Sequence, residues 1–413
     1  MSTSENQLRS HNIAAYALEK PFTQTETGMP LETFGFRLSV VLRRSDEDFL
    51  VDITRGRSRQ LVARFAVTEA EQVSWVTRDP SISVSDYVPR RGLSFIDVEL
   101  NGETNELCRT LIDQSYDRMI SKMSKHQRLV LELTQSQLSE DEILDRLIES
   151  CGLSEQSTSI LAGVLPTTLL VPFPSASDSP PLGASFVGGV PDLDPADDWP
   201  VTPEGRSLGF LGQFNLEDFG DSLPDAFPRK GLLSIFSVWA HHDPKGADWK
   251  WDENYAGESD APAKIRITAL ERLSRRSVPA DVRLYPCVLV RPVRVPDLGA
   301  VQRIPPFNNL DWGDPMRSAL GDLEDDFDAI LMHRYYGNFN SMHGHHRLGG
   351  AGRYQQQFPE ELRDTDLTVI ATFGSEDLTQ MNWGDGGELT LLANLDDVCR
   401  GATTAIWTEN QGG

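Results

Sequence analysis

The chain has 413 residues, of which 62 are acidic and 38 basic, so its formal net charge is −24. This balance argues against a nucleic-acid partner, because phosphate binding needs a basic face, and it favours a basic protein partner. No apolar run approaches the roughly 18 residues of a membrane span and no secretory signal pattern is present, so we expect a cytoplasmic protein without membrane contact. A chain of this length predicts two or three domains.

The motif content argues against cofactor chemistry. The four cysteines lie far apart and form no C-x-x-C pair, which predicts reduced thiols. The glycine spacing of a dinucleotide site, the phosphate-binding loop and the G-x-S-x-G elbow of hydrolases do not occur. We therefore predict no cofactor.

The first part of the chain changes from strand-like to helical patterns. Residues 1–30 are polar and weakly patterned, which predicts a flexible arm. Residues 31–160 begin with short β-branched segments and continue with apolar residues at three- and four-residue steps. Ser139, with Glu142 three residues later, predicts a capping box, and Gly152 is placed to end that helix. We predict a small α+β domain of unknown type over residues 31–160.

Residues 161–186 contain proline at a density that predicts a linker, since proline interrupts helices and central strands. Residues 187–413 then hold one pattern twice: a double-glycine turn, a strand that ends in an acidic turn, and a glycine-led strand. The three blocks lie at 187–191, 208–219 and 231–238, and their counterparts at 348–352, 367–378 and 387–394 follow after 161, 159 and 156 residues.

The near-constant offset predicts an internal duplication, with halves at about 187–300 and 301–413. Two such halves would pack across a pseudo-twofold axis and bury one shared core. A cleft between them is a natural ligand position.

Four segments of this region, SFVGGVPDLDPADDWP, GLLSIFSV, GHHRLGGAGRYQQ and MNWGDGGELTLL, resemble the YwqG-like family of uncharacterised bacterial proteins, domain of unknown function 1963. The resemblance covers about residues 165–410, and residues 1–160 fall outside it. It implies an α+β fold of mainly antiparallel sheet and no established activity, cofactor or catalytic residue. Members similar to it are sometimes encoded beside bacterial toxin–immunity genes, which suggests a binding role.

The resemblance also marks family-typical positions. They are Gly188, Gly189, Trp199, Gln213, His346, Gly349, Gly350, Gln356, Asn382, Trp383, Gly384 and Asp385. The choice among Gln355, Gln356 and Gln357 stays open, because this chain has AGRYQQQ where the family tends to place a proline-bearing turn.

The histidines in HGHHRLGG are candidates for a metal site. His343, His345 and His346 offer imidazole, the commonest metal ligand. Their H-x-H-H spacing has no fixed helical geometry, and only His346 matches the family pattern. We favour a structural or solvent-facing role and predict no metal.

The stretch NWGD has two interpretations. In the first, Asp385 is a general base, Asn382 fixes a substrate and Trp383 stacks on it. In the second, the polar side chains bond backbone amides of a tight turn and Trp383 anchors that turn in the core. We favour the second, because no nucleophile or base is nearby in sequence.

These observations favour a binding or recognition protein, regulatory or immunity-like, that docks a basic protein partner on its acidic face. The alternative is an enzyme or metal-dependent protein that uses a cleft between the two halves, with His346, Asn382 and Asp385 contributing. Of the two, we favour the role without catalysis.

Overall fold

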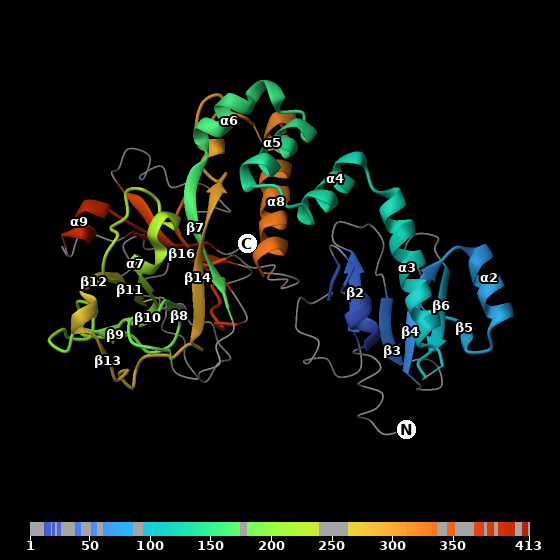
Figure 1. Ribbon diagram of the computed structural model, residues 1–413, viewed down its shortest axis with the longest axis horizontal. Helices are drawn as coiled ribbons and strands as arrows, with labels where there is room; N and C mark the ends of the chain where they lie inside the picture. The colour runs from blue at the N-terminus through green and yellow to red at the C-terminus, as the bar shows by residue number, and fades with distance from the viewer. Residues whose placement is uncertain are drawn as a thin grey trace. The chain divides into compact units, whose positions relative to one another are not determined.

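The computed structural model describes most of the chain, in two compact units (Figure 1). The described residues are 12–17, 19–20, 23–25, 38–42, 51–55, 61–85, 94–101, 103–173, 180–238, 263–311, 313–336, 345–351, 367–375, 378–383, 387–400 and 407–411. The first unit comprises Met1–Cys151 and Asp325–Asn340, and the second Gly152–Glu324 and Ser341–Gly413. Within the described residues, no helix has the length and apolar character needed to cross a bilayer.

The first unit is a six-stranded antiparallel sheet covered by helices. The strand order is β1 (Thr23–Thr25), β2 (Leu38–Leu42), β3 (Val51–Arg55), β4 (Leu61–Val67), β6 (Ser94–Glu99) and β5 (Ile82–Val84). Alternate residues such as Phe65 and Ile96 are buried on one face, as the two-residue period of a strand requires. They pack against Leu111 and Ile112 of helix α3 (Asn105–Lys122). Helix α2 (Glu69–Arg78) follows β4.

Two further helices complete this part of the unit, α4 (Lys125–Thr134) and α5 (Glu140–Ser150). At α5 the Ser139 hydroxyl accepts the backbone N–H of Glu142, and the Glu142 side chain accepts the N–H of Ser139. The predicted capping box is therefore confirmed. Gly152, just beyond the helix, has a φ of 74°.

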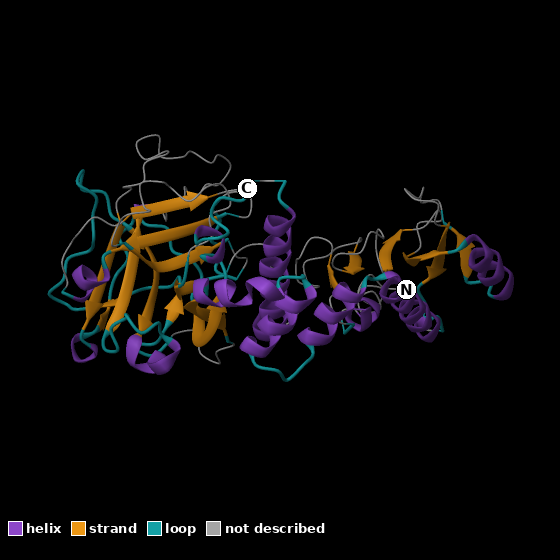
Figure 2. Cartoon of the chain, turned by 90° about the horizontal axis from the view of Figure 1, so that it is seen from above, coloured by secondary structure: helices purple, strands orange, loops and turns teal. Residues whose placement is uncertain are grey.

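The second unit is built on a ten-stranded antiparallel sheet, drawn in orange in Figure 2. The strand order is β12 (Ala263–Thr268), β11 (Leu232–Ser237), β10 (Gly209–Asn215), β8 (Phe186–Val187), β14 (Val288–Asp297), β7 (Leu165–Pro172), β15 (Arg347–Gly349), β16 (Thr368–Gly374), β17 (Glu388–Ala393) and β18 (Trp407–Gln411). Counted outward from the central pair β14 and β7, each strand of one half has a counterpart in the other. The predicted α+β class with antiparallel sheet is confirmed.

The counterparts share their register as well as their order. Gly212 lies opposite Ile235 in the first half, and Ala371 lies opposite Leu391 in the second, 159 and 156 residues later. The same offsets relate all six paired positions of the two hairpins, and the register shift inside β10 recurs at the corresponding place in β16. Register shifts of this kind are specific features of a fold and not random defects. Their recurrence at corresponding places shows that the two halves share one structural pattern.

The two central strands exchange places between the halves. β7 precedes the first copy in sequence but pairs with β15, whereas β14 precedes the second copy but pairs with β8. In their mutual register, Leu170, Val171 and Pro172 lie opposite Pro292, Arg291 and Val290. Leu348 of β15 pairs with Thr168, and its counterpart Val187 of β8 pairs with Val288, so each β7 residue has its counterpart 120 positions later in β14. The pseudo-twofold axis passes through the pair Val171–Arg291.

One apolar core serves both halves. It joins Phe214 of β10 to Phe373 of β16, two counterparts whose ring centroids are 6.5 Å apart. Helices α7 (Leu216–Phe219) and α9 (Leu395–Cys399) contribute their buried apolar side chains to the same cluster. The predicted shared core therefore exists. A separate cluster, which includes Phe186, Phe210 and Phe236, lies within the first half.

Part of the segment predicted as a linker is a central strand of this sheet. Helix α6 (Ser157–Gly163) leads into β7, in which Pro166 and Pro172 lie near the two ends. Only Thr167–Leu169 pair with β15, so the prolines remove no hydrogen bond on that side. Proline density is thus compatible with a central strand whose neighbour is short.

Candidate functional site

The double-glycine turns lie where the short strands β8 and β15 end. Four glycines form them: Gly188, Gly189, Gly349 and Gly350. All four have φ between 69° and 83°, in the left-handed region that favours glycine. A Cβ at Gly188 would lie 2.1 Å from the carbonyl oxygen of Pro286, and one at Gly350 would lie 2.3 Å from Oδ2 of Asp297. Backbone shape and close approach, not chemistry, require glycine here.

Gln213 of β10 fastens the loop that follows the first turn. Its Oε1 accepts the backbone N–H of Asp192 at 2.8 Å, and its Nε2 donates to Asp192 Oδ2 at 2.8 Å. Asp192 is fully buried, accepts the N–H of Gly183 and pairs with Arg275. The amide of Gln213 is therefore fully used inside the fold. Asp192 belongs to β9 (Asp192–Leu193), which pairs with β13 (Ser274–Arg275).

The two family-typical tryptophans both anchor loops. Trp199 packs edge-on against Phe236, with ring centroids 5.6 Å apart, and donates its indole N–H to the carbonyl oxygen of Leu208. Trp383 is only 2% exposed, and its backbone N–H donates to the Ser375 hydroxyl at 2.9 Å. This is the contact expected if Trp383 anchors a turn in the core.

Two of the three candidate histidines, His345 and His346, lie in the described part of the chain, and both are buried. His346 is 3% exposed, its ring lies 5.6 Å from that of Phe373, and its Nε2 is 3.4 Å from the hydroxyl of Thr379. His345 is 8% exposed, whereas His343 lies outside the described residues. An imidazole buried against a core phenylalanine is poorly placed to receive a solvent-borne metal.

Of the NWGD stretch, Asn382 is exposed and Trp383 buried. Gly384 and Asp385 lie outside the described residues, as does Gln356. The predicted meeting of His346, Asn382 and Asp385 in one cleft therefore stays a prediction.

A row of buried polar side chains crosses the second half of the sheet. Arg347, Thr372 and Thr390 lie opposite one another on β15, β16 and β17 and are at most 3% exposed. The two threonine hydroxyls are 3.3 Å apart. Arg347 is 3.7 Å from Asp297 Oδ2, and each of these two side chains is 4% exposed.

The counterparts of this row in the first half are Phe186, Gln213 and Ser234. The symmetry thus preserves the backbone but puts a buried charge in one half where the other has a phenylalanine. The repeated pattern predicted strands within residues 367–378 and 387–394, but it gave no reason to expect a buried arginine at 347.

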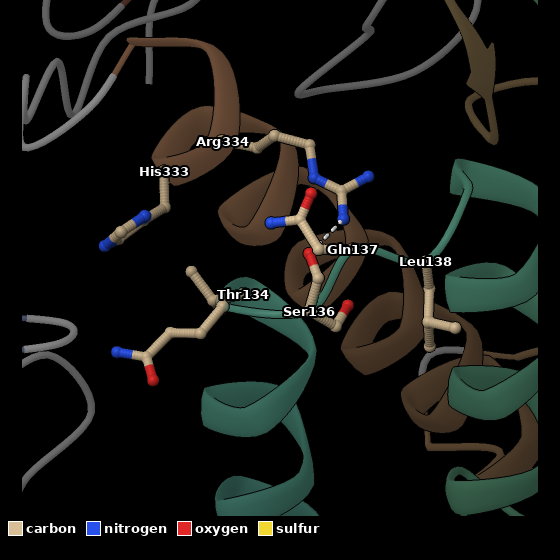
Figure 3. A pocket seen from close by; sticks show the side chains of 7 residues that line it. Thr134, Ser136, Gln137, Leu138, His333 and Arg334 are labelled. Carbon is tan, nitrogen blue, oxygen red and sulfur yellow. Dashed lines mark hydrogen bonds between the residues drawn. The ribbon is translucent and has the colours of Figure 1, made fainter.

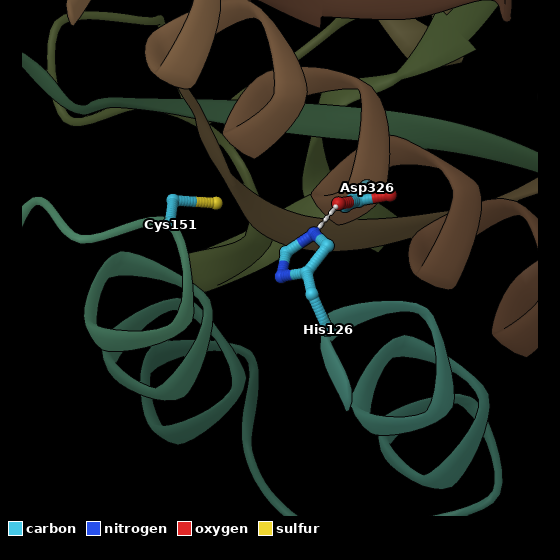
Figure 4. A group of neighbouring side chains, drawn as sticks. All are labelled: His126, Cys151 and Asp326. Carbon is cyan, nitrogen blue, oxygen red and sulfur yellow. Dashed lines mark hydrogen bonds and ion pairs between the residues drawn. The ribbon is translucent and has the colours of Figure 1, made fainter. Parts of the chain in front are cut away.

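A second group of reactive side chains, missed in the sequence, lies in the first unit (Figure 4). His126 lies in the first turn of helix α4 and Asp326 lies in helix α8 (Pro315–Tyr336), with His126 Nε2 2.6 Å from Asp326 Oδ2. His126 Nδ1 is 2.7 Å from the hydroxyl of Ser150. The potential ligand atoms of His126, Cys151 and Asp326 all lie within 4.8 Å of one another.

Sequence distance explains why this group was missed, since His126 and Asp326 are 200 positions apart. One signal was present. Asp326 falls among Leu323, Phe327 and Ile330, the buried apolar stripe of α8, and is itself fully buried. An acidic residue in an apolar stripe marks a site that needs a partner.

A cavity of about 450 Å³ lies at the turn between α4 and α5, beside the end of α8 (Figure 3). It is lined by Thr134, Gln135, Ser136, Gln137, Leu138, His333 and Arg334. Arg334 donates to Glu140 Oε1 at 2.9 Å and to the carbonyl oxygen of Ser136 at 3.0 Å. Burial lowers the pKa of His333. Because Glu140 already neutralises Arg334, this cavity is poorly suited to an anion.

Comparison with protein families matches residues 185–409 to the model of a domain of unknown function (DUF1963). The match covers more than half of the 413 residues and includes both glycine turns. No curated protein matches the chain.

Proposed function

The chain belongs to the DUF1963 family, which carries no assigned activity, and from that premise we propose that it is a recognition protein of regulatory or immunity type that docks a basic protein partner. The main support is the use that the fold makes of the family-typical residues. Gly188 and Gly350 fit turns that exclude a Cβ, Gln213 is bonded to Asp192, and Trp383 is buried. Because these residues stabilise the fold itself, we infer that binding takes place on the surface that the fold supports.

An acidic segment, which we define as residues 217–225, gives that surface a suitable charge. Its exposed acidic side chains are Glu217, Asp218, Asp221 and Asp225, the last of which is already paired with Arg229 and Arg294. It follows β10 and includes α7, whose apolar side chains Leu216 and Phe219 fix it to the core. Such a surface would steer a cationic partner towards the second unit.

Two arginines hold the backbone of the acidic segment. Arg229 donates to the carbonyl oxygens of Gly220 and Leu223 at 2.7 and 3.1 Å. Arg294 donates to those of Asp221 and Leu223 at 3.0 and 2.9 Å. A surface ordered before binding loses less conformational entropy when the partner arrives, which favours docking on this segment.

The test begins with capture of partners from the native host on the immobilised full chain, identified by mass spectrometry. Binding of the purified partner is then compared between the wild type and the triple variant Glu217→Lys, Asp218→Lys and Asp221→Lys. We expect the triple variant to bind at least roughly tenfold more weakly, and added salt to weaken the wild type, because surface charges are screened.

The matched control reverses three exposed acidic residues of the first unit: Glu103, Glu132 and Asp145. It changes the net charge by the same amount, so it separates the acidic segment from overall charge. Equal losses in the two triple variants, or binding that is indifferent to salt, would overturn the proposal.

A further inference from the structure

We propose that His126, Cys151 and Asp326 form a transition-metal site, best suited to Zn²⁺, in the first unit. The three side chains come from the start of α4, the residue after α5, and α8, and their potential ligand atoms lie within 4.8 Å of one another (Figure 4). Asp326 lies within the family match, but His126 and Cys151 precede it. The site therefore depends on the region that this chain has in front of the matched domain.

The donor set selects the metal. An imidazole nitrogen, a thiolate sulfur and a carboxylate oxygen are the three ligand types that zinc accepts. The sulfur disfavours Mg²⁺ and Ca²⁺, which take oxygen ligands, and the carboxylate disfavours Cu(I), which prefers sulfur. Three protein ligands leave a fourth tetrahedral position for water or a small ligand, as in zinc sites that do chemistry.

The geometry is close to that of a bound ion. Zinc bonds of about 2.0–2.3 Å place neighbouring tetrahedral ligand atoms roughly 3.3–3.8 Å apart. The observed 2.6 Å between His126 Nε2 and Asp326 Oδ2 must open by about 1 Å, and the Cys151 sulfur, which lies within 4.8 Å of both atoms, must close by at most about 1 Å. Side-chain rotations supply movements of this size. The side chain of His126 is 27% exposed, which provides a path for the ion, while that of Asp326 is fully buried.

A hydrogen-bonding partner already orients the imidazole. Ser150 Oγ lies 2.7 Å from His126 Nδ1, so with a metal ion on Nε2 the N–H at Nδ1 would donate to this hydroxyl. Metal-binding histidines usually have such a partner on the other ring nitrogen. Without the ion, a proton between Nε2 and the buried Asp326 carboxylate accounts for their 2.6 Å contact, and the proposed ion would take the place of that proton.

The position of Cys151 favours a metal ligand over a catalytic nucleophile. It is the C-cap residue of α5, at the negative end of the helix dipole, which disfavours a thiolate. The helix end alone does not stabilise a thiolate at Cys151, but a bound dication would.

The first test is titration of the metal-stripped full chain with Co²⁺, which reports its ligands by absorption. We expect one equivalent with the visible bands of a tetrahedral site and a thiolate-to-cobalt charge-transfer band. Cys151→Ser should abolish the charge-transfer band, while the matched controls Cys287→Ser and Cys399→Ser should keep it. Ser150→Ala should weaken binding by roughly 10–100-fold, as loss of an orienting partner does. A charge-transfer band that survives Cys151→Ser would overturn the proposal.

The second test needs no variant and is unaffected if a substitution harms folding. Alkylation of each cysteine in the wild type is followed by peptide mass spectrometry with and without Zn²⁺. We expect Zn²⁺ to slow modification of Cys151 by roughly tenfold or more, because the bound thiolate no longer attacks, and to leave the exposed Cys399 unchanged. Equal rates at Cys151 with and without the ion would contradict the site.

Discussion

The first half of the large sheet buries a phenylalanine at the position where the second half buries an arginine. Phe186 packs with Phe210, whereas its counterpart Arg347 pairs with Asp297 in an environment nearly closed to solvent. Strand order, register and the shift inside the second strand of each half are nevertheless the same. A duplicated scaffold thus retains its backbone constraints while the side chains between them diverge.

The features that the two halves share are features of the backbone. Both glycine turns use left-handed backbone, and both hairpins carry the same bulge. Among the described family-typical residues, the four turn glycines, Gln213 and the two tryptophans follow this division, because they mark the turns and loop anchors. A pattern typical of a family can therefore report how a fold is held without identifying a reaction.

The largest expected effect comes from adding a methyl group at the turns. Gly188→Ala and Gly350→Ala should each lower the free energy of unfolding by about 2–5 kcal/mol, from left-handed backbone strain and overpacking together. Gly205 is the matched control, because its φ is 85° but no atom lies within 4 Å of its Cβ position. Gly205→Ala should cost only about 1–2 kcal/mol in urea unfolding. Equal costs at all three positions would show that close approach is not the constraint.

A loss of stability of intermediate size is expected at Ser375, where the second half has a hydroxyl that the first half lacks. Its backbone N–H donates to Gly387, as that of its counterpart Leu216 does to Gly231. The hydroxyl is specific to the second half and bridges Gly387 and Trp383. Ser375→Ala leaves the buried N–H of Trp383 without this acceptor and should cost about 1–3 kcal/mol, measured by urea unfolding with tryptophan fluorescence.

The exposed Ser83 of β5 provides the control for that substitution. Ser83→Ala should change stability by less than about 0.5 kcal/mol. If Ser375→Ala were as mild, the hydroxyl would not hold the tryptophan loop.

The smallest effect concerns the threonine pair of the polar row. Thr372→Val and Thr390→Val should each cost about 0.5–1.5 kcal/mol, because each leaves one buried hydroxyl without its partner. The double variant should cost less than the sum, since replacing both partners removes the unsatisfied group. Strictly additive losses in the double-mutant cycle would show that the two hydroxyls do not interact.

The sequence predicted the features that depend on local patterns. The three offsets anticipated the two halves, and Ser139 with Glu142 predicted the start of α5. It misassigned the segment of β7, because the prolines near its ends resemble those of a linker. It missed Arg347 and the contact between His126 and Asp326, because burial of a charge and contact over 200 positions are set by tertiary packing.

The central claim is that two interleaved halves meet at an axis through Val171 and Arg291. Disulfide formation in the double variant Val171→Cys and Arg291→Cys tests it most directly, because directly opposed strand residues have Cα atoms about 4.5–5.5 Å apart, within reach of a disulfide. We expect mass spectrometry to find peptides linked between positions 171 and 291, and none linked when the second cysteine is placed at Val295, which lies opposite Thr167. Linkage of 171 to 295 with none to 291 would contradict the register, and with it the symmetry.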